Sequence, residues 1–340
     1  MSEPEPSPPE ELALRTFRRM LLARTLEDKI SALYHAGKIV GGVYLGKGQE
    51  AFSASLTTHL KKGRDIFGPL IRDQAGRLAF GEPLEDAART YFGSAMGPMR
   101  GRDGNIHRGR PSEGIPAMIS HLGSMVSVVA GMLVARRFKG TLAGTVGAVT
   151  SGDGGTSTGA FHEGLNMAAV EKLPLVVSVA NNQFAYSTPT ERQYACENLV
   201  ARAAGYGIEG HSIDATNFFT CLETFATAVA RARAGHGPQL VVGSLLRLAG
   251  HGEHDDASYV TPDLKSDPSF PDCLTRAAAD LIAKGYTTET ELADMRSAAT
   301  DRVQAAVAQA QKEPSPDPYS ETWHALKSSH LTEGSHLPTP

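Results

Sequence analysis

The sequence predicts an α/β fold in which a mostly parallel sheet carries helices on both faces. Residues 145–150 form a strand-like run, and residues 175–180 form a very apolar run that is typical of a strand buried on both faces. A helix-like segment over residues 158–170 lies between them, and a strand, a helix and a strand at this spacing indicate a βαβ unit. The same alternation continues with a shorter strand near Ile208, a helix over 217–234 and a third apolar strand over 239–248.

The segments before this sheet are expected to be mainly helical. Residues 10–37 carry apolar side chains at helical spacing, and Gly37 ends the pattern. A glycine-rich stretch follows, and a second helix-like segment begins at Gln49. Residues 93–116 are rich in Gly, Arg and Pro without periodicity, and a loop of that length in a compact domain is more often functional than idle. A helix of small residues over 124–138 then leads into the first strand.

The two ends of the chain differ from its middle. Thr288-x-x-Glu291 is a capping box, which predicts the start of an Ala-rich helix running to about residue 312. Residues 1–10 are acidic and rich in Pro, so we expect a disordered leader. Residues 313–340 are expected to form a polar, flexible tail. The sequence therefore predicts one domain over residues 11–312, and it contains no internal repeat.

The composition excludes several classes of protein. The 33 Lys and Arg residues against 37 Asp and Glu give a net charge of −4, so nucleic-acid binding has no electrostatic support. No apolar run reaches the length of a membrane span. The three cysteines are far apart and form no C-x-x-C motif, which excludes zinc-ribbon, iron–sulfur and disulfide-scaffold proteins and fits a reducing compartment. The leader is unlike a secretory signal or a transit peptide, so we expect a cytoplasmic protein.

Polar residues follow the first two predicted strands. The turn Gly152-Asp153-Gly154-Gly155 comes after one strand, and Asn181-Asn182 comes after the next. Parallel strands end at a common edge, where α/β proteins bind ligands, and glycines let backbone N–H groups approach a phosphate. The side chains of Asp153 and Asn182, with the carbonyl of Phe184, offer oxygen ligands for Mg²⁺. These residues predict a Mg²⁺–diphosphate site, and a plain glycine turn is the alternative.

These motifs occur with others in an order that resembles one enzyme family. Over about residues 12–312 the chain is similar to the α subunit of the thiamine-diphosphate-dependent E1 component of 2-oxo acid dehydrogenase complexes. The resemblance implies the thiamine-diphosphate-binding fold, with thiamine diphosphate and Mg²⁺ as cofactors. The motifs that carry it are Phe17-Arg-Arg-Met20, Gly48-Gln-Glu-Ala51, Gly104-Asn-Ile-His107, Gly152-Asp-Gly-Gly155, Phe161-His-Glu-Gly-Leu-Asn-Met-Ala168, Lys172-Leu-Pro174 and Gly250-His-Gly-Glu-His-Asp-Asp256.

The resemblance implies a role for each matching residue. Asp153 and Asn182 would ligate Mg²⁺ through their side chains, and Phe184 through its carbonyl. The turn Gly152, Gly154 and Gly155 would receive the diphosphate, which Arg72 would clamp with its planar guanidinium. An ordinary surface arginine is the alternative for Arg72.

Further implied roles concern the rest of the cofactor and the chemistry. The backbone at Ser120 and Leu122 would hold the aminopyrimidine ring. His251, in a loop beside the cofactor, and His107 would be the catalytic histidines, for proton transfer or charge stabilisation during acyl transfer. Tyr44 would lie near the cofactor at a position where many relatives carry His.

Alternatives remain open for both histidines. His107 could instead be a loop side chain that is bonded to a carbonyl. His251-x-x-His254, with nearby acidic residues, could bind a transition metal, although the loop lacks the helical spacing that would bring such ligands together. Gly252 occupies the position where regulated relatives carry a phosphorylatable Ser, so control by phosphorylation at that site is excluded here.

The resemblance also implies partners and a reaction. In the family, the carboxylate that activates the aminopyrimidine comes from a separate β subunit, so we expect an α2β2 heterotetramer, with the small-residue helix over 124–135 as a candidate interface. The expected reaction is decarboxylation of a 2-oxo acid and reductive acylation of the lipoyl group of an E2 acyltransferase. Pyruvate is the first expected substrate, followed by a branched-chain 2-oxo acid and by acetoin.

Two hypotheses from other classes also stay open. One is a non-catalytic diphosphate-binding subunit that retains the Asp153 and Asn182 pair. The other is a dinucleotide oxidoreductase, which is disfavoured because no G-x-G-x-x-G motif opens the first strand–helix turn.

Overall fold

A computed structural model of the protein describes residues 9–102, 107–317 and 319–320. Most of the predicted leader and of the predicted tail lies outside the described residues, as does the Gly104-Asn-Ile part of one motif. Within the described residues, no helix is long and apolar enough to cross a membrane.

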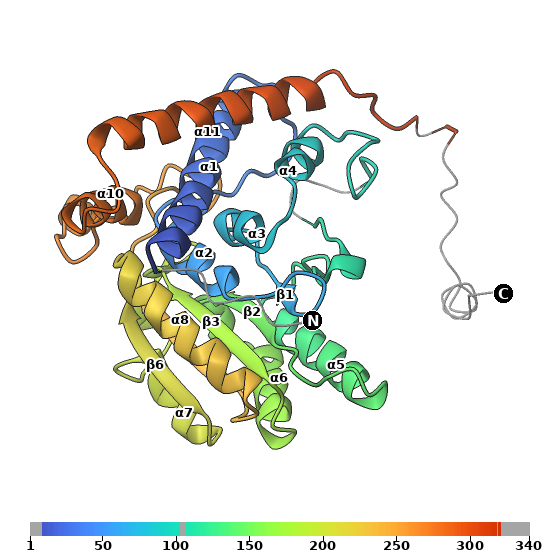
Figure 1. The fold of residues 1–340 in the computed structure, drawn as a ribbon, viewed down its shortest axis with the longest axis vertical. Helices are drawn as coiled ribbons and strands as arrows, with labels where there is room; N and C mark the ends of the chain where they lie inside the picture. Colours follow the sequence, from blue (N-terminus) through green and yellow to red (C-terminus); the bar gives the residue numbers. More distant parts are fainter. Residues whose placement is uncertain (1–8, 103–106, 318, 321–340) are drawn as a thin grey trace.

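The predicted α/β fold is confirmed, because a five-stranded sheet with all strands parallel forms the centre of the chain (Figure 1). Its strand order is β1-β2-β3-β7-β6. The strands are β1 (Ile66–Gly68), β2 (Gly147–Gly152), β3 (Leu175–Asn181), β6 (Glu209–Asp214) and β7 (Gln239–Ser244).

Both faces of this sheet are buried, because helices cover each of them. Successive side chains of a strand therefore join different apolar clusters. On β3, Val177 and Val179 join one apolar cluster, whereas Val176 and Ala180 join another. The first cluster is covered by α5 (Ser124–Phe138) and α6 (Gly159–Val170). The second is covered by α2 (Glu50–Thr58) and α8 (Phe218–Arg233).

The two crossover helices lie on opposite faces for a topological reason. The β2–α6–β3 connection steps along the sheet in one direction, and the β6–α8–β7 connection steps in the other. Crossovers of the same hand that run in opposite directions place their helices on opposite faces of a sheet. The order of strands therefore reverses next to β3, and ligands of open α/β sheets bind beside such a reversal.

A third layer of helices packs outside α2 and α8. Figure 1 shows α11 (Glu289–Ala310) lying across α1 (Pro9–His35). A third apolar cluster joins these helices to α3, α4 and α10. Those helices are α3 (Gln74–Phe80), α4 (Leu84–Tyr91) and α10 (Cys273–Ala283), and the remaining short helices are α7 (Arg202–Gly205) and α9 (Pro262–Lys265).

The predicted third strand, over 239–248, is too long. β7 ends at Ser244 because the partner strand β3 ends at Asn181, and the next residues leave the sheet. Leu245 N donates to Asn181 O at 3.1 Å and Arg247 N to Asn182 O at 3.4 Å. Residues 245–248 therefore lie at the carboxyl edge of the sheet and are not part of the strand.

Among the described helices and strands, β1, α3, α4, α7, α9 and α10 have no counterpart in the sequence predictions, and neither does the short antiparallel pair of β4 (Phe184–Ala185) and β5 (Thr188–Pro189). β1 has three residues and α3 has seven, so neither is long enough to show a period. A signal for α10 did exist, because Asp272 is a suitable N-cap and its side chain accepts from Leu274 N at 2.9 Å.

Candidate functional site

A cavity of about 280 Å³ lies at the carboxyl edge of the sheet. The parallel register sets Gly152 beside Ala180, and Ala180 beside Gly243, so the chain segments that follow these strands meet there. Nine predicted site residues line the cavity: Arg72, Leu122, Gly152, Asp153, Gly154, Gly155, Asn182, Phe184 and His251.

The glycine turn forms one wall of this cavity. A Cβ on Gly154 would lie 2.4 Å from Ala185 Cβ, and one on Gly155 would lie 2.6 Å from Ser151 Oγ. Both positions therefore require glycine for close approach of the backbone. The turn leads into α6, which begins after its N-cap Thr158, so backbone N–H groups gather where an anion would be favoured.

The three predicted metal ligands come together at the cavity. Asp153 and Asn182 are both buried, and Asn182 Oδ1 accepts from Phe184 N at 3.3 Å. Gln183 adopts φ +76°, a left-handed turn that brings Phe184 back to the cavity wall. One carboxylate, one amide oxygen and one carbonyl match the ligand preference of a hard cation such as Mg²⁺.

Burial raises the pKa of the Asp153 carboxyl, and its neighbours only partly offset this effect. Gln193 Nε2 donates to Asp153 Oδ2 at 2.9 Å, and the charge of Arg247 also favours the ionised form. A divalent cation at this carboxylate would stabilise the ionised form further, because a bound ion is the largest local charge in such a site.

Two buried guanidinium groups face the same cavity. Arg72 donates to Leu45 O at 2.8 Å and to His251 O at 2.5 Å. Arg247 donates to Ala249 O at 3.1 Å. Within the described residues neither arginine forms an ion pair with a carboxylate, although both line the cavity. Burial and the neighbouring charge of Arg247 lower the pKa of Arg72 to about 10, so this pair of cations favours an anionic ligand.

Sequence reasoning missed Arg247. It lies in the run that was predicted as an apolar strand, and a charged side chain near the end of such a run was the available signal. Its guanidinium also bonds Tyr186 O at 3.0 Å and the hydroxyl of Tyr259 at 2.5 Å. Gln193, the partner of Asp153, was missed too, because nothing in its local sequence indicates the site.

His251 lines the cavity and contacts two tyrosine rings. The ring centroid of Tyr186 is 4.5 Å away and that of Tyr44 is 5.4 Å away, both in edge-on geometry. His251 N donates to Asp255 Oδ2 at 2.5 Å. Burial, followed by the charges of Arg72 and Arg247, lowers the pKa of His251 to about 4, so the imidazole is neutral near pH 7.

The transition-metal alternative for the His251 loop is wrong on this geometry. No group of three or more His, Cys, Asp or Glu side chains could hold a metal ion in the described parts of the chain, which include the whole loop. His254 instead packs against the ring of Tyr44 at a centroid distance of 6.3 Å.

Three predicted site residues are not among those that line the cavity: Tyr44, His107 and Ser120. Tyr44 reaches the site through its ring contact with His251. His107 Nε2 lies 2.5 Å from Ser120 Oγ, so these two are brought together beside the cavity-lining Leu122. The hydroxyl of Ser120 is thus one hydrogen-bond partner of His107. The alternative in which His107 also bonds a backbone carbonyl stays open.

Comparisons with known proteins point to one family. The family model described as "Dehydrogenase E1 component" matches residues 18–319. The alpha subunit of 2-oxoisovalerate dehydrogenase from Bacillus subtilis is 33% identical, covering 92% of this chain and 94% of the relative. The alpha subunit of acetoin:2,6-dichlorophenolindophenol oxidoreductase from Cupriavidus necator is 31% identical, with 91% and 92% covered. The pyruvate dehydrogenase E1 alpha subunit from Rhizobium meliloti is 31% identical, with 89% and 87% covered.

The chain therefore belongs to the dehydrogenase E1 component family, with its alpha subunits as relatives. Enzymes of this family depend on thiamine diphosphate. The chain is accordingly an oxidoreductase of the 2-oxo acid dehydrogenase E1 type.

Proposed function

We propose that this chain is the α subunit of an E1 enzyme that uses thiamine diphosphate and Mg²⁺ to decarboxylate a 2-oxo acid, with pyruvate as the first candidate. The acyl group is then transferred to the lipoyl group of an E2 acyltransferase. One observation carries the proposal: a buried carboxylate with two oxygen ligands and two buried guanidinium groups line a single cavity at the carboxyl edge of the sheet.

The residues of the cavity fit a metal–diphosphate group. Asp153, Asn182 and the carbonyl of Phe184 would hold Mg²⁺. The turn Gly152, Gly154 and Gly155 would accept the diphosphate close to the backbone, since side chains there would clash or narrow the cavity. Arg72 and Arg247 would bind phosphate oxygens, which are the anionic partners that these guanidinium groups lack among the described side chains.

The remaining residues have roles around the rest of the cofactor. The bound cofactor supplies a carbanion and an electron sink for decarboxylation. Ser120 and Leu122 would hold its aminopyrimidine ring from the segment before α5. His251, which is neutral near pH 7, would hold or pass a proton during acyl transfer, and the ring of Tyr44 would keep the imidazole in place. His107 would be the second catalytic histidine.

The partners follow from the same proposal. An E1 β subunit would complete the active site in an α2β2 heterotetramer, and an E2 acyltransferase would accept the acyl group. The helix α5 is the candidate interface, because Gly131 and Phe138 are exposed on it and a Cβ added to Gly131 would meet no atom within 4 Å. The three cysteines of the chain are free, which supports a cytoplasmic location.

The substrate is the open part of the proposal. The relatives are named for acetoin, 2-oxoisovalerate and pyruvate, at 31%, 33% and 31% identity, so similarity alone favours none of the three. A branched-chain 2-oxo acid and acetoin are therefore the alternatives to pyruvate. A non-catalytic diphosphate-binding subunit is a further alternative.

The deciding experiment reconstitutes the chain with a candidate β subunit and measures two quantities. Calorimetry measures thiamine diphosphate affinity with and without Mg²⁺, and activity is assayed with pyruvate, 2-oxoisovalerate and acetoin. We expect Mg²⁺-dependent binding and turnover of one substrate. Binding without turnover of any of the three would favour the non-catalytic alternative.

The variant Asp153→Ala tests the metal assignment. It should abolish the Mg²⁺-dependent part of the binding, because the only charged ligand of the proposed set is lost. Asp294→Ala, which removes an exposed carboxylate on α11, is the matched control and should bind as the parent does. Unchanged cofactor affinity in Asp153→Ala would contradict the proposed metal site.

A further inference from the structure

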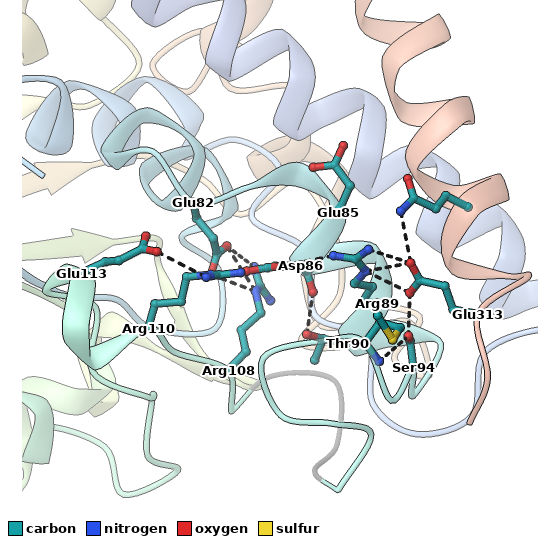
Figure 2. A network of polar contacts seen from close by, with 12 residues as sticks. Glu82, Glu85, Asp86, Arg89, Thr90, Ser94, Arg108, Arg110, Glu113 and Glu313 are labelled. Atoms are coloured by element: carbon teal, nitrogen blue, oxygen red, sulfur yellow. Dashed lines mark hydrogen bonds and ion pairs between the residues drawn. The ribbon is translucent and has the colours of Figure 1, made fainter. Parts of the chain in front are cut away.

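A buried cluster of charged side chains joins the loop at His107 to helices α3 and α4 (Figure 2). Glu82, Arg77 and Arg108 are all more than nine-tenths buried. Arg108 Nη2 donates to Glu82 Oε2 at 3.0 Å, and Arg108 Nε lies 3.2 Å from both oxygens of that carboxylate. Arg77 Nη1 donates to Glu82 Oε1 at 2.9 Å, so one carboxylate serves two guanidinium groups.

Arg108 is held through both its side chain and its backbone. Its Nη2 also donates to Gln74 Oε1 at 2.6 Å, and its carbonyl accepts from Arg77 Nη2 at 3.3 Å. Gln74 is the first residue of α3 and directly follows Arg72 and Asp73, both of which line the cavity. A planar guanidinium can serve a carboxylate and an amide at once in fixed directions, which the point charge of a lysine cannot do.

A second contact ties the same loop to α4. Arg110 bonds Asp86, which is buried on α4, and Arg110 Nη1 also donates to Glu113 Oε1 at 3.3 Å. Figure 2 shows these side chains between α4 and the loop. Arg108 and Arg110 of the loop therefore bond side chains of the segment that holds α3 and α4.

His107 directly precedes this anchored residue. Its Nε2 lies 2.5 Å from Ser120 Oγ, and Ser120 is two residues before the cavity-lining Leu122. The side chain and the carbonyl of Arg108 are both held, so the Cα atom to which the peptide unit of His107 is joined has a fixed place. The ion pairs thus hold one end of the peptide unit that carries His107.

We propose that Arg108 is the positioning residue of His107, holding the imidazole against Ser120 through the buried ion pair with Glu82. The inference rests on the proposed function only for its catalytic consequence. The contact itself is a property of this chain and can be tested without turnover.

The test measures how fast diethyl pyrocarbonate modifies His107, with peptide mass spectrometry as the readout on the folded, full-length chain. The exposed His236 serves as the internal reference. Ser120→Ala removes the hydroxyl partner and should raise the rate at His107 about fivefold, as expected for one net hydrogen bond. Arg108→Met should raise it by a similar factor, and Arg108→Lys, which keeps the charge opposite Glu82, by a smaller one.

Arg137→Met is the matched control, because it breaks an Arg–Glu pair of 2.7 Å between Arg137 and Glu171 far from the loop, and it should leave the rate unchanged. A parental rate at His107 in a folded Arg108→Met chain would overturn the proposal. If that variant does not fold, the same comparison with Arg108→Lys decides. An unchanged rate in Ser120→Ala would overturn it as well.

The catalytic consequence has its own readout in the reconstituted enzyme. Arg108→Met should lower kcat for lipoyl acylation with little change in the cofactor affinity. In combination with His107→Ala it should add nothing, because a positioning residue acts through the residue that it positions. Additive losses would overturn the link to His107. Absence of any turnover in the parent would contradict the proposed function and leave the modification result standing.

Discussion

At the scale of single residues, the candidate site contains buried groups of opposite charge. The carboxyl of Asp153 and the guanidinium groups of Arg72 and Arg247 are all buried, and burial raises the pKa of Asp153 and lowers the pKa of Arg72. A metal–diphosphate group would supply a cation to the carboxylate and an anion to the guanidinium groups at the same time. Stabilisation of both kinds of charge by one such ligand would explain why the site retains side chains that are costly to bury.

His251 carries the residue-scale prediction. His251→Ala should leave thiamine diphosphate affinity nearly unchanged, because the imidazole contacts rings and Arg72 rather than the glycine turn. Acyl transfer to a lipoyl domain should fall by about 10²-fold or more, the usual contribution of a positioned acid–base group. His236→Ala, at an exposed turn, is the control. Normal acyl transfer in His251→Ala would remove this residue from the catalytic set.

At the scale of elements, the sequence predicts best where a pattern is long. α5 and α6 match their predicted ranges within a residue, since helices of 15 and 12 residues show several turns of periodicity. β1 and α3 do not, because three and seven residues carry too little pattern. The turn that follows β2 could be predicted because its glycines and Asp153 are adjacent in the sequence. Gln193 and Arg108 were not predicted, because only the folded chain brings them to Asp153 and to His107, and Arg247 was missed although it is a charged residue near the end of an apolar run.

The capping box of α11 carries the element-scale prediction. Thr288 Oγ1 accepts from Glu291 N at 3.3 Å, and Glu291 Oε2 accepts from Thr288 N at 2.9 Å, as the sequence predicts. Thr288→Ala should lower the free energy of unfolding by about 1 kcal/mol, the usual cost of losing an N-cap. Thermal or denaturant unfolding would measure this loss. Thr300→Ala, in the exposed middle of α11, is the control, and equal losses in both variants would argue against the cap.

At the scale of the whole molecule, the outer helices join the inner ones through partly buried ion pairs. Arg24 on α1 bonds Glu50 on α2 at 2.5 Å and Asp272, before α10, at 2.8 Å. Glu27, one turn along α1, accepts from Gly46 N at 2.8 Å through Oε1, whereas its buried Oε2 has no hydrogen-bond partner in the described structure. Burial, with the nearby charge of Glu50, raises the pKa of Glu27 to about 8.

This raised pKa predicts how stability depends on pH. Between the ordinary value of about 4.5 and the folded value of about 8, the folded chain keeps the Glu27 proton and the unfolded chain loses it. The contribution of Glu27 to stability is therefore fully present below about pH 4.5 and is lost as pH rises towards 8. Glu27→Gln, which cannot ionise, should lose less stability than the parent between pH 5 and pH 8, which denaturant midpoints would show. Glu163→Gln on the exposed face of α6 is the control, and identical pH slopes for Glu27→Gln and the parent would contradict the assignment.

The cavity is lined by side chains that range from Gln49 to His251 along the chain. No fragment that stops short of the last of these residues can assemble all of its walls, so only a folded chain that reaches at least His251 is able to retain the vitamin-derived group proposed for it. Binding of this group would then distinguish folded chains with a complete cavity from chains that lack part of it. Truncated or misassembled copies would stay empty, and the loaded ones would gain resistance to heat from the ligand they carry.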